Sequence, residues 1–154
     1  MRGGRWCDAL VSALRSAGWA PTLVFVVHVV ISRGFGAYVL LPPLDIPMHF
    51  FGGVAISYFI AKGYNIAEAH GLLGQPARCL YFVTVSAVAT TTTVLWEFAE
   101  FLSDRYFGTH AQLGLEDTLS DMLLGCLGSL VFLGVGALTS NRAVVPAAVK
   151  DEDA

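Results

Sequence analysis

Three apolar segments of this sequence each carry two ionisable side chains near one end. The first opens with an aspartate and a histidine, the second closes with two glutamates, and the third opens with two aspartates. Acidic side chains at the edges of membrane-length helices are costly unless they face water, a partner or an ion. Any chemistry of this chain is therefore expected at six residues: Asp45, His49, Glu97, Glu100, Asp117 and Asp121.

The spacing within each pair is helical. The outer two pairs are four residues apart and the glutamates three apart, so the members of a pair share one face of a helix. Carboxylate oxygens suit Mg²⁺, Mn²⁺ or Ca²⁺, and an added imidazole also admits Zn²⁺ or Fe²⁺. All six residues are therefore candidate ligands of a divalent cation (Mg²⁺, Mn²⁺, Ca²⁺ or Zn²⁺) or of a lipid headgroup. In an enzyme, Glu97 and His49 would be the candidate catalytic residues that transfer protons.

Carboxylates that converge on one site cannot all stay ionised without compensation. A bound cation would supply it. Protons shared with His49, or salt bridges to Arg33 and Arg105, would supply it equally. The sequence leaves these three possibilities open.

Helix capping is a simpler role for some of the acids. Thr118 and Asp121 have the spacing of a capping box, and acids favour a helix N-terminus. Glu97 and Glu100 lack this explanation, because they fall near a predicted helix C-terminus, where the helix dipole disfavours anions. The two glutamates are therefore the strongest functional candidates.

The composition predicts the elements that position these residues. Of 154 residues, 55% are hydrophobic and 14% are charged, whereas soluble domains have about 25% charged residues. A membrane-spanning helix needs about 20 residues, so four such helices with short loops nearly fill the chain. We expect an all-α polytopic membrane protein with about four transmembrane helices in one bundle.

Prolines, glycines and charged residues set the expected boundaries. The predicted spans are residues 19–41, 46–64, 79–102 and 118–138, with a polar loop over 63–78 and an interruption of the first span at 32–36. Trp96 is expected to be an interfacial anchor. His28 is expected to form an interhelical hydrogen bond.

Basic residues predict the orientation. One side of the spans collects Arg2, Arg5, Arg15, Lys62, Arg78, Arg142 and Lys150. By the positive-inside rule this side is cytoplasmic, so the six candidate residues face outward. Residues 1–18 then form a basic cytoplasmic segment, either an amphipathic surface helix presenting Trp6, Leu10 and Leu14 or a frayed tail. Residues 19–139 form the transmembrane domain, and residues 140–154 form a disordered cytoplasmic tail.

Three motifs resemble a known family. The segments DIPMHFFGG, WEFAEFLSDRYFG and GLEDTLSDMLLGCLGSL, within about residues 40–135, resemble the YjdF-type bacterial inner-membrane family of unknown function. In general layout the chain is also similar to the VanZ-like proteins, which are associated with glycopeptide-antibiotic resistance. The resemblance implies a small multi-helix protein of the bacterial inner membrane, and it assigns no catalytic residue.

Three kinds of function fit these observations, and they leave open whether the protein is an enzyme. The first is a cation- or headgroup-binding site at the outer leaflet, acting on a lipid-linked envelope substrate. The second is a transport or proton-relay module along the polar stripe Thr90, Thr93, Glu97, Glu100 and Asp104. The third is a non-catalytic structural or partner-binding bundle. The bilayer is the expected partner, a homo-oligomer is compatible with the sequence, and nucleic-acid binding is not expected because no basic, aromatic-interleaved face is present.

Overall fold

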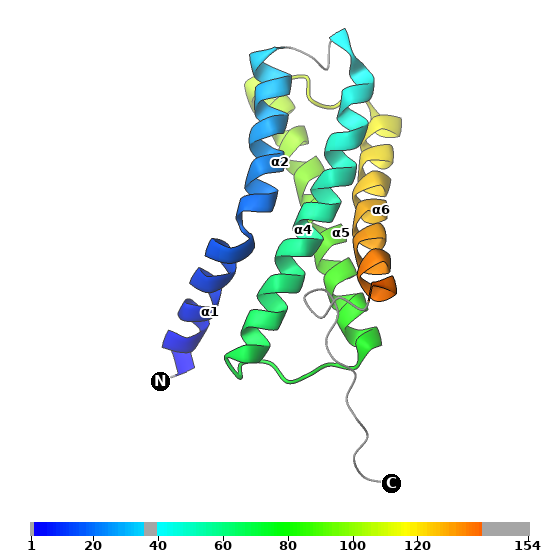
Figure 1. Ribbon diagram of the computed structural model, residues 1–154. Helices are drawn as coiled ribbons and strands as arrows, with labels where there is room; N and C mark the ends of the chain where they lie inside the picture. The colour runs from blue at the N-terminus through cyan, green and yellow to red at the C-terminus, as the bar shows by residue number, and fades with distance from the viewer. Residues whose placement is uncertain (1, 36–39, 140–154) are drawn as a thin grey trace.

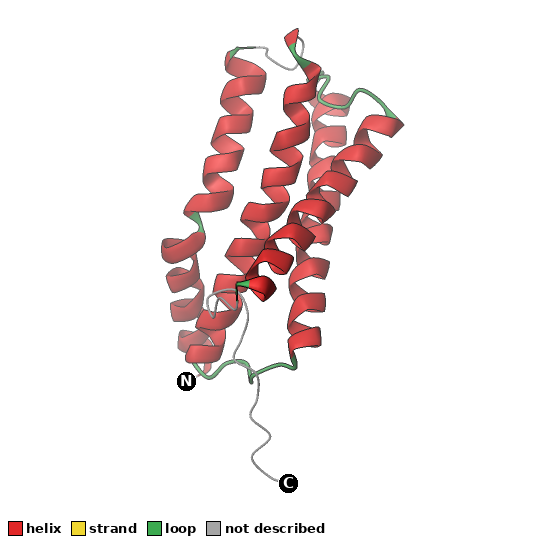
Figure 2. Ribbon diagram, turned by 45° about the vertical axis from the view of Figure 1, so that its right-hand side comes forward, coloured by secondary structure: helices red, strands yellow, loops and turns green. Residues whose placement is uncertain are grey.

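The protein is all-helical. The computed structural model describes residues 2–35 and 40–139, and over these ranges every regular element is a helix. The fold class predicted from the sequence is therefore confirmed (Figures 1 and 2). The predicted tail over residues 140–154 lies outside the described residues.

The chain begins with a bent helix pair. Helix α1 (Arg2–Ala17) and helix α2 (Trp19–Val29) meet at Gly18, and their axes differ by 54°. A Cβ atom at Gly18 would lie 2.5 Å from the carbonyl oxygen of Leu14, so the bend requires glycine. Pro21 follows in the first turn of α2, where its missing N–H costs least.

Helix α2 continues into the π-helix η1 (Val30–Gly34), where the sequence predicts an interruption. A single π-turn is a common way to break helical regularity. The interruption thus begins at Val30, two residues before the predicted 32–36, and residue 36 itself lies outside the described range.

Helix α1 packs against the bundle. Its buried face consists of alanines, namely Ala9, Ala13 and Ala17, and it contacts α4. Trp6, Leu10 and Leu14 point away and are about half exposed. The N-terminal segment is thus a helix rather than a frayed tail, and its apolar side chains remain available to lipid.

Helix α4 (Asp45–Ala69) is the centre of the bundle. It follows the short 3₁₀-helix η2 (Pro42–Leu44) and contacts α1, α2, α5 and α6. The predicted loop over 63–78 is wrong for residues 63–69, which continue α4. The reason is packing, because α1 covers this part of α4 and Ala67 is buried there. A helix surrounded by protein also needs less hydropathy than one surrounded by lipid.

Helices α5 (Arg78–Phe107) and α6 (Leu115–Leu138) complete the fold. Helix α5 extends five residues beyond the predicted end and stops at Gly108, whose φ of 64° suits glycine. Helix α6 begins three residues before the predicted start. Both helices are long and apolar enough to span a membrane, and the bent α1–α2 pair makes a third candidate if it forms one span. The described residues thus offer two to three candidate spans, where the sequence predicts about four.

Small residues set the closest helix contact. A Cβ atom at Gly53 would lie 2.0 Å from the carbonyl oxygen of Gly125, so α4 and α6 approach at this point nearly backbone to backbone. Glycine permits such an approach because it has no side chain. The contact lies one turn below His49 on α4 and one turn below Asp121 on α6, and therefore fixes the separation of these two side chains.

The candidate residues lie at one end of the bundle. The start of α4, the end of α5 and the start of α6 meet there (Figure 1). The short helix η2 leads into α4, and the 108–114 loop joins α5 to α6. The start of α1, the end of α4 and the start of α5 lie at the other end. Three helices thus deliver their ionisable side chains to the same level.

Candidate functional site

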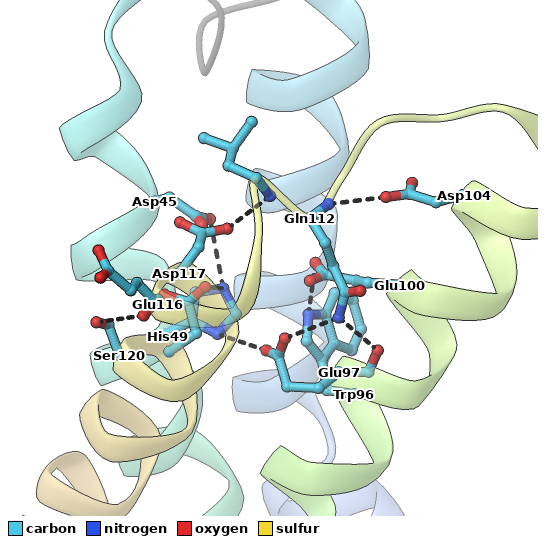
Figure 3. Close-up of polar contacts among 12 residues, drawn as sticks. Asp45, His49, Trp96, Glu97, Glu100, Asp104, Gln112, Glu116, Asp117 and Ser120 are labelled. Carbon is cyan, nitrogen blue, oxygen red and sulfur yellow. Dashed lines mark hydrogen bonds and ion pairs between the residues drawn. The ribbon is translucent and has the colours of Figure 1, made fainter.

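His49 is the centre of the site. Its Nε2 atom lies 3.4 Å from Oδ1 of Asp45 and 3.7 Å from Oδ2 of Asp121, and its Nδ1 atom lies 3.7 Å from Oε1 of Glu97 (Figure 3). The four side chains come from α4, α5 and α6. Both nitrogens of one imidazole therefore face carboxylates, and these carboxylates belong to three different helices.

The centre of the site is buried and incompletely hydrogen-bonded. The side chains of His49, Glu97 and Asp121 are only 5–6% exposed. Nε2 of His49 and Oε1 of Glu97 have no hydrogen-bond partner within the described part of the chain. Buried polar atoms almost always have partners, and an exception calls for an explanation such as an ion.

The distances suit a metal ion. Two ligand atoms that each lie about 2.1 Å from a tetrahedral ion are about 3.4 Å apart. Ligand atoms of Asp45, His49 and Asp121 all lie within 4.8 Å of one another, and so do those of His49, Glu97 and Glu100. Five of the six residues predicted from the sequence therefore lie in two three-residue groups that share His49.

Helix α5 supplies two glutamates that other side chains hold in place. The Gln112 amide donates to Oε2 of Glu97 at 3.3 Å and to the Glu97 carbonyl at 3.0 Å. The Trp96 indole N–H donates to Oε1 of Glu100 at 2.9 Å. Trp96 is half-buried, so its predicted role as an interfacial anchor is replaced by a contact with the site.

The expected helix-end position of these glutamates is wrong. Helix α5 runs on to Phe107, so Glu97 and Glu100 lie before its last turn. The helix dipole acts mainly within the last turn and therefore has little effect on these two glutamates. Their burial is what requires an explanation. Glu97 is 4% exposed and Glu100 is 9% exposed.

Asp117 and Asp121 have different roles. Gly114 occupies the N-cap position of α6 and makes no side-chain cap, so the expected capping box of Thr118 and Asp121 is wrong. Asp117 instead accepts a hydrogen bond from the Leu113 backbone N–H at 3.0 Å. Asp117 is therefore a capping residue, and Asp121, one turn further on, belongs to the site.

Asp104 organises the loop over the site. It accepts hydrogen bonds from the Thr109 hydroxyl, from the Ala111 N–H at 2.6 Å and from the Gln112 N–H at 2.9 Å. This arrangement places the Gln112 side chain on Glu97 (Figure 3). Asp104 therefore acts on the site through the loop.

Basic side chains do not compensate the acids in the described structure. Arg105 is exposed, and the only ion pairs between described side chains are those of His49. The Arg33 side chain lies outside what is described. His110 is exposed in the 108–114 loop, and His28 lies edge-on to Trp96 with ring centroids 5.2 Å apart.

The polar stripe predicted along α5 ends at its threonines and does not continue along the helix. Thr93 hydrogen-bonds to the carbonyl of Ala89, and Thr90 lies 3.4 Å from the Cys126 sulfur. Towards the other end of α5 the buried face continues through Ala89, Val85 and Tyr81.

The contact of Gln112 with Glu97 was not predicted from the sequence, because nothing in the loop sequence shows which side chain turns inward.

A comparison with protein families identifies the chain. The family described as predicted membrane proteins, DUF2238, matches residues 13–142. The chain belongs to this family. The YjdF-type family is the same family, so the predicted resemblance to it is confirmed. Membership in a membrane-protein family implies a lipid bilayer environment. No curated protein and no solved structure matches the chain, and the similarity to VanZ-like proteins stays a prediction.

Proposed function

We propose that this protein binds one divalent transition-metal ion through Asp45, Nε2 of His49 and Asp121. The observation that supports the proposal is the buried imidazole with a carboxylate at each nitrogen. Carboxylates alone would suit Mg²⁺, Mn²⁺ or Ca²⁺, whereas an imidazole favours Zn²⁺ or Fe²⁺, so Mn²⁺ and Zn²⁺ represent the two kinds of ligand in this set. Three protein ligands leave coordination positions open for water or a substrate group.

Glu97 has the position of an orienting carboxylate. A metal-bound histidine usually donates its other ring N–H to a carboxylate or carbonyl, which fixes the tautomer and the ring orientation. Oε1 of Glu97 faces Nδ1 of His49, and Gln112 holds the other oxygen. This arrangement assigns Nε2 to the metal and Nδ1 to Glu97.

Within the bilayer, we place the metal site at the outer leaflet of the bacterial inner membrane. Arg5, Lys62 and Arg78 lie on the elements at the opposite end of the bundle, and basic residues favour the cytoplasmic side. An ion at this depth could polarise a phosphate or activate a water molecule next to a lipid-linked substrate.

Metal titration of the purified protein tests the proposal. We expect about one equivalent of Zn²⁺ or Mn²⁺ to bind to the wild type, and Asp121→Asn to weaken binding by at least about 100-fold, more than the loss of an orienting residue. Glu116→Gln is the matched control, because Glu116 lies on the same helix and is exposed. A wild type that binds neither ion, or an Asp121→Asn variant that binds like the wild type, would contradict the proposal.

A proton relay is the second candidate, and one observation favours it. The hydroxyls of Ser57, Tyr81 and Ser129 are buried without hydrogen-bond partners among the described residues. Ser57 and Ser129 lie two turns below His49 and Asp121 on their helices, in the direction of the opposite membrane face. Proton flux into liposomes that is reduced by Ser57→Ala with Ser129→Ala would support the relay, and an absence of flux would exclude it.

A further inference from the structure

An apolar cavity lies beside the carboxylate site, and the proposed metal does not use it. It has a volume of about 230 Å³ and is enclosed by α2, α4 and α5. Its walls are mostly apolar and include Phe25, Met48 and Ile56. The polar groups of the lining are His28, His49, Thr92, Thr93 and Trp96. A side chain of the carboxylate site is therefore also part of the cavity wall.

The cavity has the dimensions of a hydrocarbon chain. Its lining on α4 runs from Met48 to Ile56, a length of about 12 Å at 1.5 Å per residue. Pockets for whole drug-sized ligands are larger, at about 300–1,000 Å³. A cavity of 230 Å³ whose lining extends over about 12 Å of α4 therefore suits one alkyl chain better than a ring system.

Two aromatic side chains from different helices contact each other in the wall of the cavity. Phe25 of α2 lies with its ring centroid 5.9 Å from that of Trp96 on α5, and Phe25 is 51% exposed. Both residues line the cavity. Because the chain belongs to a membrane-protein family, hydrocarbon is the medium outside this aromatic pair.

Charge selects the head of such a ligand. His49 and Trp96, which line the cavity, directly contact Glu97 and Glu100, so two carboxylates lie immediately behind the wall. No described Lys or Arg forms an ion pair with them. The aromatic rings of Phe25 and Trp96 also attract cations. The carboxylates of Asp45, Glu97 and Asp121 outnumber the one imidazole that lies between them, so the cluster attracts a cationic head and repels an anionic one.

We propose that this cavity binds a single-chain alkylammonium amphiphile, with its chain between α2, α4 and α5 and its ammonium group next to His49 and the carboxylates. The ligand enters from the bilayer past Phe25 and Trp96. Its binding does not require the metal. A bound metal would neutralise part of the negative charge and thereby reduce the preference for a cationic head.

The test uses Trp96 as the reporter in the full-length protein in lipid nanodiscs. Trp6 and Trp19 are replaced by phenylalanine, so that Trp96 is the remaining tryptophan. The probes are dodecylammonium and dodecyl sulfate, each brominated near the head so that contact quenches the fluorescence of Trp96. We expect the ammonium probe to quench at an at least about tenfold lower concentration than the sulfate probe, since like-charge contacts are strongly unfavourable. Equal quenching by the two probes would overturn the proposal.

Glycine substitutions provide the matched pair. Gly52 lines the cavity, and a Cβ atom there would meet no other atom within 4 Å, so Gly52→Leu fills the cavity without a backbone clash. Gly134 is equally open and lies outside the cavity lining. We expect Gly52→Leu to abolish quenching by the ammonium probe and Gly134→Leu to preserve it. Quenching that persists in Gly52→Leu would show that the probe binds elsewhere and would overturn the proposal.

Zinc binding, measured on the same variants, separates this proposal from the metal proposal. Gly52→Leu keeps all three proposed ligands, so it should bind Zn²⁺ like the wild type. Zinc binding without selective ammonium binding would overturn only the cavity proposal, and selective ammonium binding without zinc binding would overturn only the metal proposal.

Discussion

Nδ1 of His49 lies 3.7 Å from Oε1 of Glu97, and both side chains are 5% exposed. The two residues come from α4 and α5, two of the three helices that enclose the cavity. A carboxylate in this position favours the tautomer that carries its proton on Nδ1, which leaves Nε2 free to bind an ion. The pair thus connects the proposed metal site, which includes Asp121 of α6, with the cavity, which His49 also lines.

The first prediction concerns this pair. Glu97→Gln keeps the size of the side chain but removes the charge that orients His49. We expect Zn²⁺ affinity to fall about 10–100-fold, the usual effect of losing an orienting partner of a metal ligand. Isothermal titration measures it, with Glu116→Gln as the control. An unchanged affinity would mean that Glu97 does not orient the histidine.

The membrane orientation gives a second prediction. Gln75 and His110 are both exposed, and they lie in the loops at opposite ends of the bundle. With the three native cysteines replaced by alanine, a membrane-impermeant thiol reagent added to intact cells should label His110→Cys and not Gln75→Cys. This follows from the basic residues near the Gln75 end. The opposite labelling pattern would place the site on the cytoplasmic side.

Helical periodicity accounts for the part of the site that the sequence predicts correctly. Residues three or four apart share a helix face, and the distribution of Lys and Arg brings three helix ends to one level. These two arguments suffice to bring Asp45, Glu97 and Asp121 together around His49. They depend on the repeat of the helix and on connectivity, and both are properties of the sequence.

The other contacts of the site depend on where the helices begin and end and on how side chains pack. A start of α6 three residues earlier than expected makes Asp117 the capping acid and leaves Asp121 inside the helix. The side chains of Trp96 and Gln112 contact the site through their rotamers and through a loop conformation. No periodic pattern encodes these contacts, because they are set by tertiary packing.

The third prediction tests the loop that covers Glu97. Asp104→Ala removes the acceptor of the Ala111 and Gln112 backbone N–H groups, and hydrogen bonds to charged groups contribute about 1.5–3 kcal/mol. We expect faster amide hydrogen exchange at both residues and a weaker affinity for Zn²⁺, because Gln112 no longer holds Glu97. Asp8→Ala, at an exposed residue of α1, is the control. Unchanged exchange would show that the loop is held by other contacts.

The last prediction concerns the close approach of α4 and α6. Gly53→Ala would place a Cβ atom 2.0 Å from the Gly125 carbonyl oxygen, which is backbone and cannot rotate away, so the two helices must separate. Overpacking of this kind costs about 1–3 kcal/mol, more than the gain of up to about 1 kcal/mol from replacing glycine by alanine in a helix. The separation would also move Asp121 on α6 away from His49 on α4, so Zn²⁺ affinity should fall together with the midpoint of thermal unfolding in detergent. Gly134→Ala is the matched control, because its Cβ atom meets nothing within 4 Å and its unfolding midpoint should stay equal or rise. If Gly53→Ala were as stable as Gly134→Ala and bound zinc like the wild type, the glycine contact would not set the spacing of the site.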